Sequence, residues 1–526
     1  MSLSPAEAAA PARPRTPARA AGLAGLARGG LASVAGSAVS AVAGVLVVLA
    51  VTRALSQVTA GLFFTLTSVY LIAETAARLG TGSGVVWAIS RARALGTPGR
   101  VPQLLRAALT PVVALSLVLA VAMAVSADAV ARLITDTGDA DVAGALRVMA
   151  CLLPLTVVSE TLVSATRGYG AILPTVVVDR LGRSLLQLAA VAVIAVTASL
   201  SGLVAAWAAP WAIAALFAGW WLVRLQRRSA ATSPEPADAG AEPGAWRDFW
   251  GFTAPRALTS IVQLALQRLD IVLLTVLAGP AQAAIYTAAT RFLVVGQFAN
   301  QALANVVEPR IGHLLTLDDR SAALTVYQTA TSWLVLLTWP FYLLVASGAD
   351  GLLDLFGNGY DAGVPVVLVL TATMLVASAI GMVDVVLIMA GSTRWNLGNA
   401  LTALALNVVL DVLLIPVLGL LGAAIGWAAA ILLKNLLPLV QVWRALGLHP
   451  FGAGTRAAVG LSLACFGLPA LLAGTVLDGM PLATVGLTAA GALLYLVGCW
   501  RWRAVLALDS LRAVRRTGRA RGVQSA

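Results

Sequence analysis

Apolar segments of about 20 residues follow one another along almost the whole chain, separated by shorter polar connections. A segment of that length spans a bilayer as a helix, because only a helix satisfies its own backbone hydrogen bonds within hydrocarbon. The pattern predicts an all-α polytopic membrane protein with about 14 transmembrane helices. Two of the predicted spans, 173–197 and 253–276, each carry three charged residues. The predicted spans are 31–53, 59–79, 106–126, 144–165, 173–197, 202–223, 253–276, 284–306, 324–346, 364–390, 396–415, 421–442, 456–476 and 480–500.

The charged residues orient these spans. Hydrophobic residues make up 60% of the chain and charged residues 11%, far below the quarter found in soluble domains. Arginines gather in every second connection, whereas the opposite connections hold only Arg132, with Arg53 at a boundary. Arginine retained on the cytoplasmic side sets topology, so both termini are predicted to be cytoplasmic. This distribution accounts for the net charge of +12 without a nucleic-acid partner.

The sequence contains no signature of an enzyme or a metal site. Its three cysteines fall inside predicted spans and its two histidines in connections, so no disulfide, metal ligand set or cofactor is expected. Phosphate-binding loops, zinc-ligand spacings and nucleophile elbows are also absent from the sequence. We therefore expect a protein that is not an enzyme.

Two halves of the chain resemble each other, which indicates an internal duplication. Gly61 corresponds to Ala284 at an offset of 223 residues, and 202–207 resembles 422–427 at an offset of 220. Each copy holds six spans, and an even number makes the two copies parallel. The predicted domains are a cytoplasmic N-terminal tail (1–30), an N-terminal six-helix bundle (31–226), a cytoplasmic linker (227–247), a C-terminal six-helix bundle (248–446), helices 13 and 14 (447–503) and a basic cytoplasmic tail (504–526).

Polar residues recur at helical spacing in three spans, which places each set on one helical face. Such stripes on apolar helices favour a polar cavity, although interhelical hydrogen bonding is the alternative. The stripes are Thr67, Glu74, Arg78 and Thr81; Arg256, Gln263, Gln267 and Asp270; and Gln297, Gln301, Asn305 and Glu308. The substrate-binding candidates are Glu74, Arg78, Arg256, Gln263, Gln267, Arg291, Gln297, Gln301 and Asn305.

Two arginines and three carboxylates have more specific expected roles. Arg256 and Arg291 have no carboxylate one helical turn away in sequence, so they are candidates for binding an anion. Glu74 and Arg78, by contrast, are spaced to pair with each other. A membrane carboxylate can carry a coupling proton or sodium ion, and the alternative is a structural ion pair with a nearby arginine. The ion-coupling candidates are Glu160, Asp270 and Asp384. For Asn407 and Asp411 the same two alternatives stay open, ion coupling or a structural role.

Three stretches of the chain carry a resemblance to a known family. The first is TRALSQVTAGLF at 52–63, which continues to ARLGTG at 77–82. The others are LFGNGYDA at 355–362 and NVVLDVLLIPVLGLLGAAIG at 407–426. Together they resemble the polysaccharide flippases of the multidrug/oligosaccharidyl-lipid/polysaccharide exporter superfamily. The resemblance covers about 30–500 and implies a cationic central cavity lined by the first two helices of each half. The first span departs from that pattern, because its core has no charge.

The resemblance implies a flippase in the bacterial cytoplasmic (inner) membrane. By alternating access it would move an undecaprenyl-diphosphate-linked oligosaccharide repeat unit to the outer leaflet, for exopolysaccharide or other cell-surface polysaccharide synthesis. The implied partners are this lipid-linked oligosaccharide and membrane lipids, with a proton or sodium ion and a polysaccharide polymerase as further candidates. Three alternatives stay open: a lipid II flippase, a multidrug or cation antiporter of the same superfamily, and a membrane scaffold of a polysaccharide assembly complex.

Overall fold

The computed structural model describes residues 17–135, 139–195, 199–232, 245–475 and 481–509. Most of the predicted linker and of both predicted tails lies outside these residues. Within them every regular element is a helix. Twelve helical stretches of the described chain are long and apolar enough to cross a membrane. The protein is therefore an all-α, multi-pass membrane protein, as the apolar pattern predicted.

Two of the fourteen predicted spans do not belong to these twelve, although both are helical. The span at 173–197 consists of a π-helix, η2 (Thr175–Arg183), followed by α7 (Ser184–Ile194), and it carries three charges. The span at 284–306 lies in α10 (Pro280–Thr316), where one arginine and several amides lower the hydropathy. Polar residues within a membrane helix usually face the protein interior or a cavity. These two segments are thus the places to look for function.

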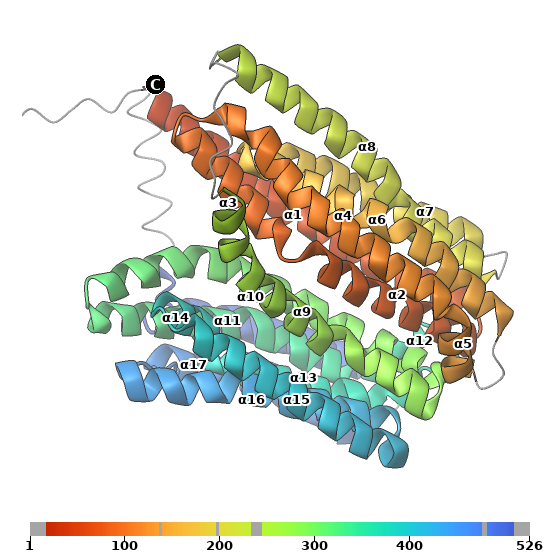
Figure 1. The fold of residues 1–526 in the computed structure, drawn as a ribbon. Helices are drawn as coiled ribbons and strands as arrows, with labels where there is room; N and C mark the ends of the chain where they lie inside the picture. Colours follow the sequence, from red (N-terminus) through yellow and green to blue (C-terminus); the bar gives the residue numbers. More distant parts are fainter. Residues whose placement is uncertain (1–16, 136–138, 196–198, 233–244, 476–480, 510–526) are drawn as a thin grey trace, which may run out of the picture.

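The helices form two layers, coloured red to olive and green to blue in Figure 1. The first layer holds α1 (Pro17–Ala54), α2 (Gln57–Arg78), α3 (Thr81–Ala94), α4 (Val101–Val125), α5 (Ala127–Thr135), α6 (Ala140–Gly168), η2, α7 and α8 (Leu200–Thr232). The second holds α9 (Ala245–Ala278), α10, α11 (Arg320–Ser347), α12 (Ala349–Asp354), α13 (Val364–Ile380), α14 (Val383–Met389), α15 (Thr393–Leu418) and α16 (Leu420–Leu446). Each layer contains five of the twelve membrane-crossing stretches, together with one of the two more polar helical segments at 173–197 and 284–306.

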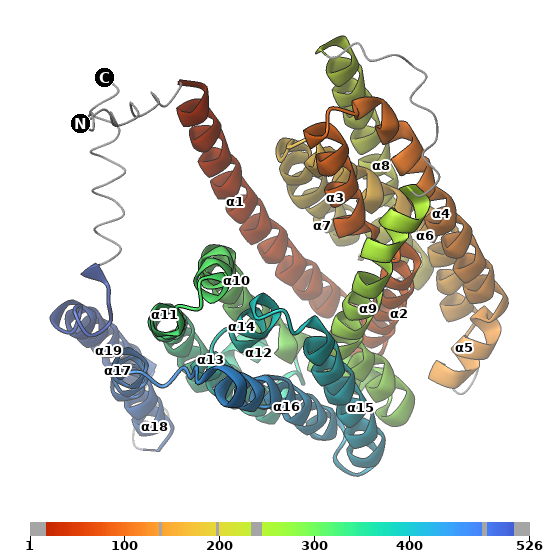
Figure 2. The same cartoon turned by 60° about the vertical axis from the view of Figure 1, so that its left-hand side comes forward.

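The C-terminal helices lie at the edge of the second bundle, beside α11 (Figure 2). They are α17 (Ala453–Ser462), the π-helix η5 (Leu463–Gly467), α18 (Leu468–Thr475) and α19 (Pro481–Arg501). The Trp333 indole donates a hydrogen bond to the Leu506 carbonyl at 2.9 Å, and the Tyr495 hydroxyl donates to the Leu336 carbonyl at 2.7 Å. The last two predicted spans are therefore peripheral to the two-bundle core.

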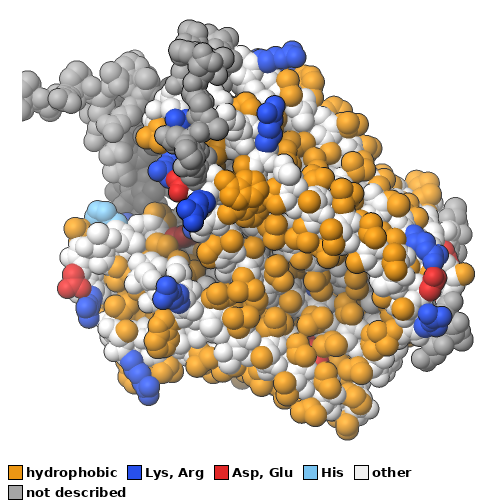
Figure 3. Space-filling model, in the orientation of Figure 1, with side chains coloured by type: hydrophobic (Ala, Val, Ile, Leu, Met, Phe, Trp, Pro, Cys, Tyr) orange, Lys and Arg blue, Asp and Glu red, His pale blue; other side chains and the backbone are white. Residues whose placement is uncertain are grey.

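Apolar and charged side chains occupy different parts of the surface, as a membrane protein requires. In Figure 3 hydrophobic side chains cover the middle of the visible face, and charged side chains gather toward its two ends. Tryptophans and leucines contribute to this exposed apolar surface, among them Trp220, Trp443 and Leu493. Exposed apolar area of this extent is unfavourable in water and favourable against lipid tails.

The two bundles share a packed core between α2 and the first two helices of the second bundle. Phe63 of α2 and Tyr286 of α10 are both buried in this core. Gly61 makes the close approach possible, because a Cβ atom at this position would overlap the Pro280 carbonyl. Nearby, the hydroxyls of Thr65 and Thr275 hydrogen-bond across the two bundles. This contact fixes how α2 meets α9 and α10.

Gly61→Ala should therefore lower thermal stability, since the new methyl group meets rigid backbone and overpacking typically costs about 1–3 kcal/mol. Gly44→Ala is the matched control, because a Cβ atom at Gly44 has open space around it. At that position the higher helix propensity of alanine should leave stability equal or raised. Melting temperatures of both variants in detergent test this. Equal melting temperatures would contradict the close packing at Gly61.

Two side chains join the bundles near the C-terminal end of α1. The Arg53 guanidinium donates to the carbonyls of Leu355 and Asp354 at 2.6 and 3.0 Å. The Gln57 side-chain amide donates to the Asn358 carbonyl at 3.1 Å. These bonds link α1 and α2 to the segment after α12, so any separation of the bundles at this end must break them.

Candidate functional site

One membrane helix of the second bundle is broken, and the break lies beside a cavity. The span predicted as continuous over 364–390 divides into α13 and α14, because Gly381 adopts φ +75°. A side chain at Gly381 would also collide with Thr331. The break places Asp384 in the first turn of α14. Discontinuous membrane helices commonly form substrate or ion sites, since their interrupted backbone needs a polar surrounding.

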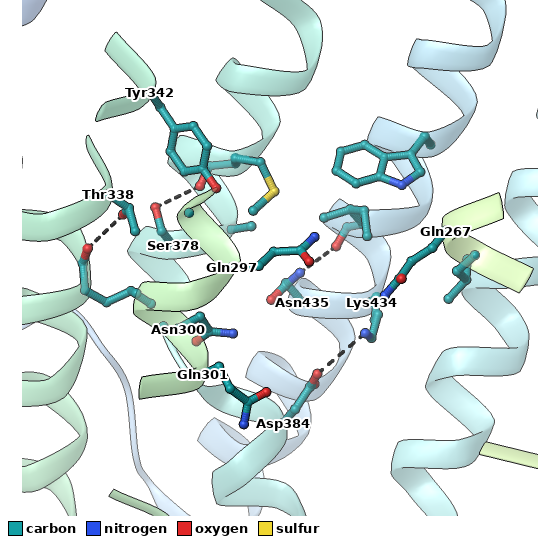
Figure 4. A pocket seen from close by; sticks show the side chains of 18 of the residues that line it. Gln267, Gln297, Asn300, Gln301, Thr338, Tyr342, Ser378, Asp384, Lys434 and Asn435 are labelled. Atoms are coloured by element: carbon teal, nitrogen blue, oxygen red, sulfur yellow. Dashed lines mark hydrogen bonds and ion pairs between the residues drawn. The ribbon is translucent and has the colours of Figure 1, made fainter. Parts of the chain in front are cut away.

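Next to this break lies a cavity of about 370 Å³, shown in Figure 4. The helices α9, α10, α11, α13, α14 and α16 all contribute to its wall. Five of the predicted site residues line it: Gln263, Gln267, Gln297, Gln301 and Asp384. Polar and aromatic residues that were not predicted from the sequence complete the lining: Asn300, Thr338, Tyr342, Ser378, Trp427, Lys434 and Asn435.

The exposed amide side chains give this cavity a polar lining, and they are not packed against apolar neighbours. Gln263 and Gln267 of α9 and Gln297 and Asn300 of α10 are exposed, although both helices lie within the bundle. Lipid tails cannot satisfy amide groups, so exposed amides at membrane depth require water or a polar ligand. The two stripes predicted over 256–270 and 297–308 thus meet at this cavity through Gln263 and Gln267 of the first and Gln297 and Gln301 of the second.

Asp384 and Lys434 face each other across the cavity wall. The Lys434 ammonium lies 3.9 Å from an Asp384 carboxylate oxygen, beyond hydrogen-bond distance. Lys434 is the only lysine in the sequence. The other Asp384 oxygen and the Tyr342 hydroxyl are buried without a hydrogen-bond partner among the described residues. Asp384 therefore faces a cation, but this cation is Lys434 of α16 and not an arginine close to it in the sequence.

A second cavity of about 80 Å³ adjoins the first. Gln267, Gln297 and Trp427 line both cavities and form their common wall. The charged residues of the smaller cavity are Arg268, Asp270 and Arg291. It therefore holds two guanidinium groups against one carboxylate, and the Arg291 side chain is fixed there by a bond from Nε to the Thr287 carbonyl at 3.1 Å.

Asp270 belongs to a buried cluster of oxygen atoms. One carboxylate oxygen accepts a hydrogen bond from the Tyr286 hydroxyl and the other from the Ile271 amide at 2.9 Å. Asp411, which lies within electrostatic range of Asp270, accepts from the Asn407 side chain at 3.2 Å. One oxygen each of Asp411 and Asn407 is buried without a partner in the described chain. The unpartnered oxygens of Asp411 and Asn407, with the Asp270 carboxylate in electrostatic range of Asp411, are of the kind that bind a cation.

The first bundle contains a separate ion cluster. Arg78 lies 2.8 Å from Glu74 and 3.4 Å from Glu160, so one guanidinium bridges two carboxylates from α2 and α6. On η2, Arg183 pairs with Asp179 at 2.7 Å. The structure thus brings Glu74, Arg78 and Glu160 together, but in a different bundle from the cavity residues. The cation beside Glu160 is thus Arg78 of α2, which lies far from it in the sequence.

Two predicted residues of the second bundle, Arg256 and Asn305, line neither of the two cavities. The Arg256 guanidinium lies 3.7 Å from the Phe252 ring centroid and donates to the Phe252 carbonyl at 2.9 Å. That ring stacks on Trp87 of the first bundle at 4.3 Å between centroids. Asn305 is exposed and accepts a hydrogen bond from Gln301 on the same helix at 3.3 Å. The polar face of α9 therefore divides, with Arg256 at the junction of the bundles and Gln263 and Gln267 at the cavity.

Comparison with known proteins identifies the fold and the family. A family model described as "Polysaccharide biosynthesis protein" matches residues 26–315, more than half of the chain. No curated protein matches the chain significantly.

Solved structures with the same fold are membrane transporters. The lipid II flippase MurJ, in an inward closed conformation, aligns with a TM-score of 0.69 at 12% identity, over 91% of this chain and 99% of that one. An inward-facing multidrug resistance MATE transporter of the MOP superfamily gives 0.61 at 16% identity, over 78% and 94%. A MOP superfamily transporter from Pyrococcus furiosus gives 0.55 at 17% identity, over 80% and 95%. At these identities the likeness shows the fold alone.

Proposed function

Since the chain belongs to the polysaccharide biosynthesis protein family of the MOP superfamily, we propose that it flips an undecaprenyl-diphosphate-linked oligosaccharide repeat unit across the bacterial cytoplasmic membrane. The family and the fold support a transporter or flippase of this superfamily. The observation that carries the proposal is the polar cavity of the second bundle adjoining the Arg268–Arg291 site.

A lipid-linked sugar has three parts, and each requires a different surrounding. Its diphosphate is an anion, which guanidinium groups bind with paired hydrogen bonds. Arg268 and Arg291 supply two such groups in a cavity within the membrane-spanning bundle. The sugars need a polar surrounding, and the isoprenoid tail stays in lipid. A scaffold protein would have no use for such a cavity, which favours a transporter over that alternative.

Alternating access requires the bundles to separate at one membrane face and then at the other. The bonds from Arg53 and Gln57 join the bundles at the end of the molecule where α1 ends and α2 begins. We place the termini on the cytoplasmic side because of the arginine distribution. The joined end is then the external one, and the bonds of Arg53 and Gln57 break when the bundles open outward.

We assign ion coupling to Asp270 rather than to Glu160 or Asp384. Glu160 contacts Arg78, and Asp384 faces Lys434, so each already has a cation partner. Asp270 accepts from neutral donors and lies in electrostatic range of Arg268 and Arg291. A proton or sodium ion bound there would neutralise a carboxylate that competes with phosphate for these arginines. Ion binding and anion binding would then favour each other.

A lipid II flippase is the second candidate, favoured by the fold shared with MurJ over 91% of the chain. Lipid II also carries an undecaprenyl diphosphate, so the Arg268–Arg291 site suits both substrates.

Depletion of the protein from its own cells separates the candidates. Under the proposal a lipid-linked oligosaccharide accumulates, and it stays inaccessible to glycosidases added outside spheroplasts, whereas the lipid II level is unchanged. Accumulation of lipid II instead would support the second candidate. Normal levels and normal sidedness of both lipids would reject both functions. The measurement is mass spectrometry of extracted lipids with and without external glycosidase.

A further inference from the structure

We propose that the larger cavity of the second bundle is a carbohydrate-binding subsite, which holds uncharged sugar residues next to the diphosphate of the lipid-linked substrate. This inference rests on the proposed function and deepens it. It assigns the two adjoining cavities different parts of one ligand: the smaller takes the anion at Arg268 and Arg291, and the larger takes the sugars.

The charges of the two cavities differ in the way this division requires. The larger cavity has one ammonium group, Lys434, and one carboxylate, Asp384, so its ionised side chains cancel. The smaller has two guanidinium groups and one carboxylate. An anionic group is therefore attracted to the smaller cavity, whereas an uncharged, hydrogen-bonding group suits the larger one.

The kind of polar group lining the larger cavity points to hydroxyl-rich ligands. Amides such as Gln263, Asn300 and Asn435 offer a donor and an acceptor side by side, which matches neighbouring sugar hydroxyls. Trp427 adds an indole at the wall shared with the smaller cavity, and an aromatic ring can cover the C–H face of a pyranose. A lipid tail would leave all these amides without partners, which is unfavourable for buried polar groups.

Unsatisfied atoms in the cavity wall mark where a ligand can bond. One Asp384 oxygen needs a donor, and the Tyr342 hydroxyl lacks any partner among the described residues. Buried polar atoms are normally hydrogen-bonded, so such groups around one cavity are informative. A sugar hydroxyl is both donor and acceptor and could satisfy either group. The volume of about 370 Å³ lies within the range of small-molecule sites.

The experiment measures binding of two lipids to the full chain in nanodiscs. The first probe is the lipid-linked oligosaccharide purified from cells depleted of the protein, and the second is sugar-free undecaprenyl diphosphate. Undecaprenol, which lacks the diphosphate, is the reference. The wild-type protein should bind the oligosaccharide lipid at least about tenfold more tightly than undecaprenyl diphosphate, because several hydrogen bonds are added.

Three variants distinguish the two cavities. Asn300→Trp fills the larger cavity and Gln263→Ala removes one of its amides, so both should lower the preference for the sugar-bearing lipid, Asn300→Trp toward equality. Arg291→Ala should weaken the binding of both diphosphate lipids by a similar factor. The preference for the sugar-bearing lipid should then stay in place. Gln103→Ala, an exposed amide on α4, is the matched control. Melting temperatures confirm that each variant is folded.

The possible failures differ from one another. Equal affinity of the wild type for both diphosphate lipids, or an unchanged preference in folded Asn300→Trp, would overturn the carbohydrate subsite alone. If neither diphosphate lipid bound the wild type more tightly than undecaprenol, the proposed function itself would fail. Weaker binding of both lipids in Asn300→Trp, with the preference intact, would show that this cavity serves the diphosphate instead, and would also overturn the inference.

Discussion

Arg291→Ala should reduce export of the lipid-linked oligosaccharide by about ten- to a hundredfold while leaving membrane abundance close to normal. A hydrogen bond to a charged group contributes about 1.5–3 kcal/mol, which corresponds to this range. The side chain lies at the smaller cavity, where its Nε atom donates to a backbone carbonyl of its own helix. Arg291→Lys should recover part of the loss, because lysine keeps the charge but not the bidentate geometry.

Export is measured as surface polysaccharide per unit of membrane protein, in cells that express each variant as the sole copy. Arg320→Ala is the control, since that arginine pairs with Asp318 on an exposed connection. Arg256→Ala is a second comparison: its side chain lies outside both cavities, so its loss should cost less than the loss of Arg291. Normal export by an abundant Arg291→Ala protein would refute the anion-binding role.

Helical periodicity explains which part of this site could be predicted from sequence. The stripes on α9 and α10 were visible because residues three or four apart share a helical face, and Gln263, Gln267, Gln297 and Gln301 all reach the cavity. Periodicity does not say where along a tilted helix a cavity ends. Arg256 continues the same face, yet it lies against Phe252 at the junction with the first bundle.

Polar residues on other helices could not be assigned in this way. Tyr342 and Lys434 lie in largely apolar spans, and only the packing of α11 and α16 around α10 brings them to one cavity. The glycine at 381 was a usable signal, since a glycine followed closely by an aspartate interrupts an otherwise apolar span. Long-range partners follow the same logic: Arg78 and Glu160 meet because α2 and α6 are neighbours in space.

Asp270→Asn should abolish ion-driven accumulation of substrate while allowing slow equilibration across the membrane. Asparagine keeps the shape of the side chain but can neither take up a proton nor offer a charged ligand to sodium. The variant also mimics the neutralised carboxylate beside Arg268 and Arg291, so it should bind the diphosphate lipid at least as tightly as the wild type. Asp411→Asn should lose the driving ion as well, because Asp411 lies within electrostatic range of Asp270.

Proteoliposomes loaded with a fluorescent lipid-linked oligosaccharide distinguish the driving ions, with a sodium gradient in one set and a proton gradient in another. The gradient that raises the steady-state asymmetry between leaflets in the wild type identifies the ion, and the asymmetry should fall to that of gradient-free vesicles in Asp270→Asn. Asp350→Asn, an exposed carboxylate at the start of α12, should behave as the wild type. Full asymmetry in Asp270→Asn would exclude this carboxylate as the coupling site. Equal asymmetry of the wild type with and without either gradient would make the protein a passive flippase. The unpartnered oxygens of Asp411 and Asn407 would then belong to a structural polar cluster.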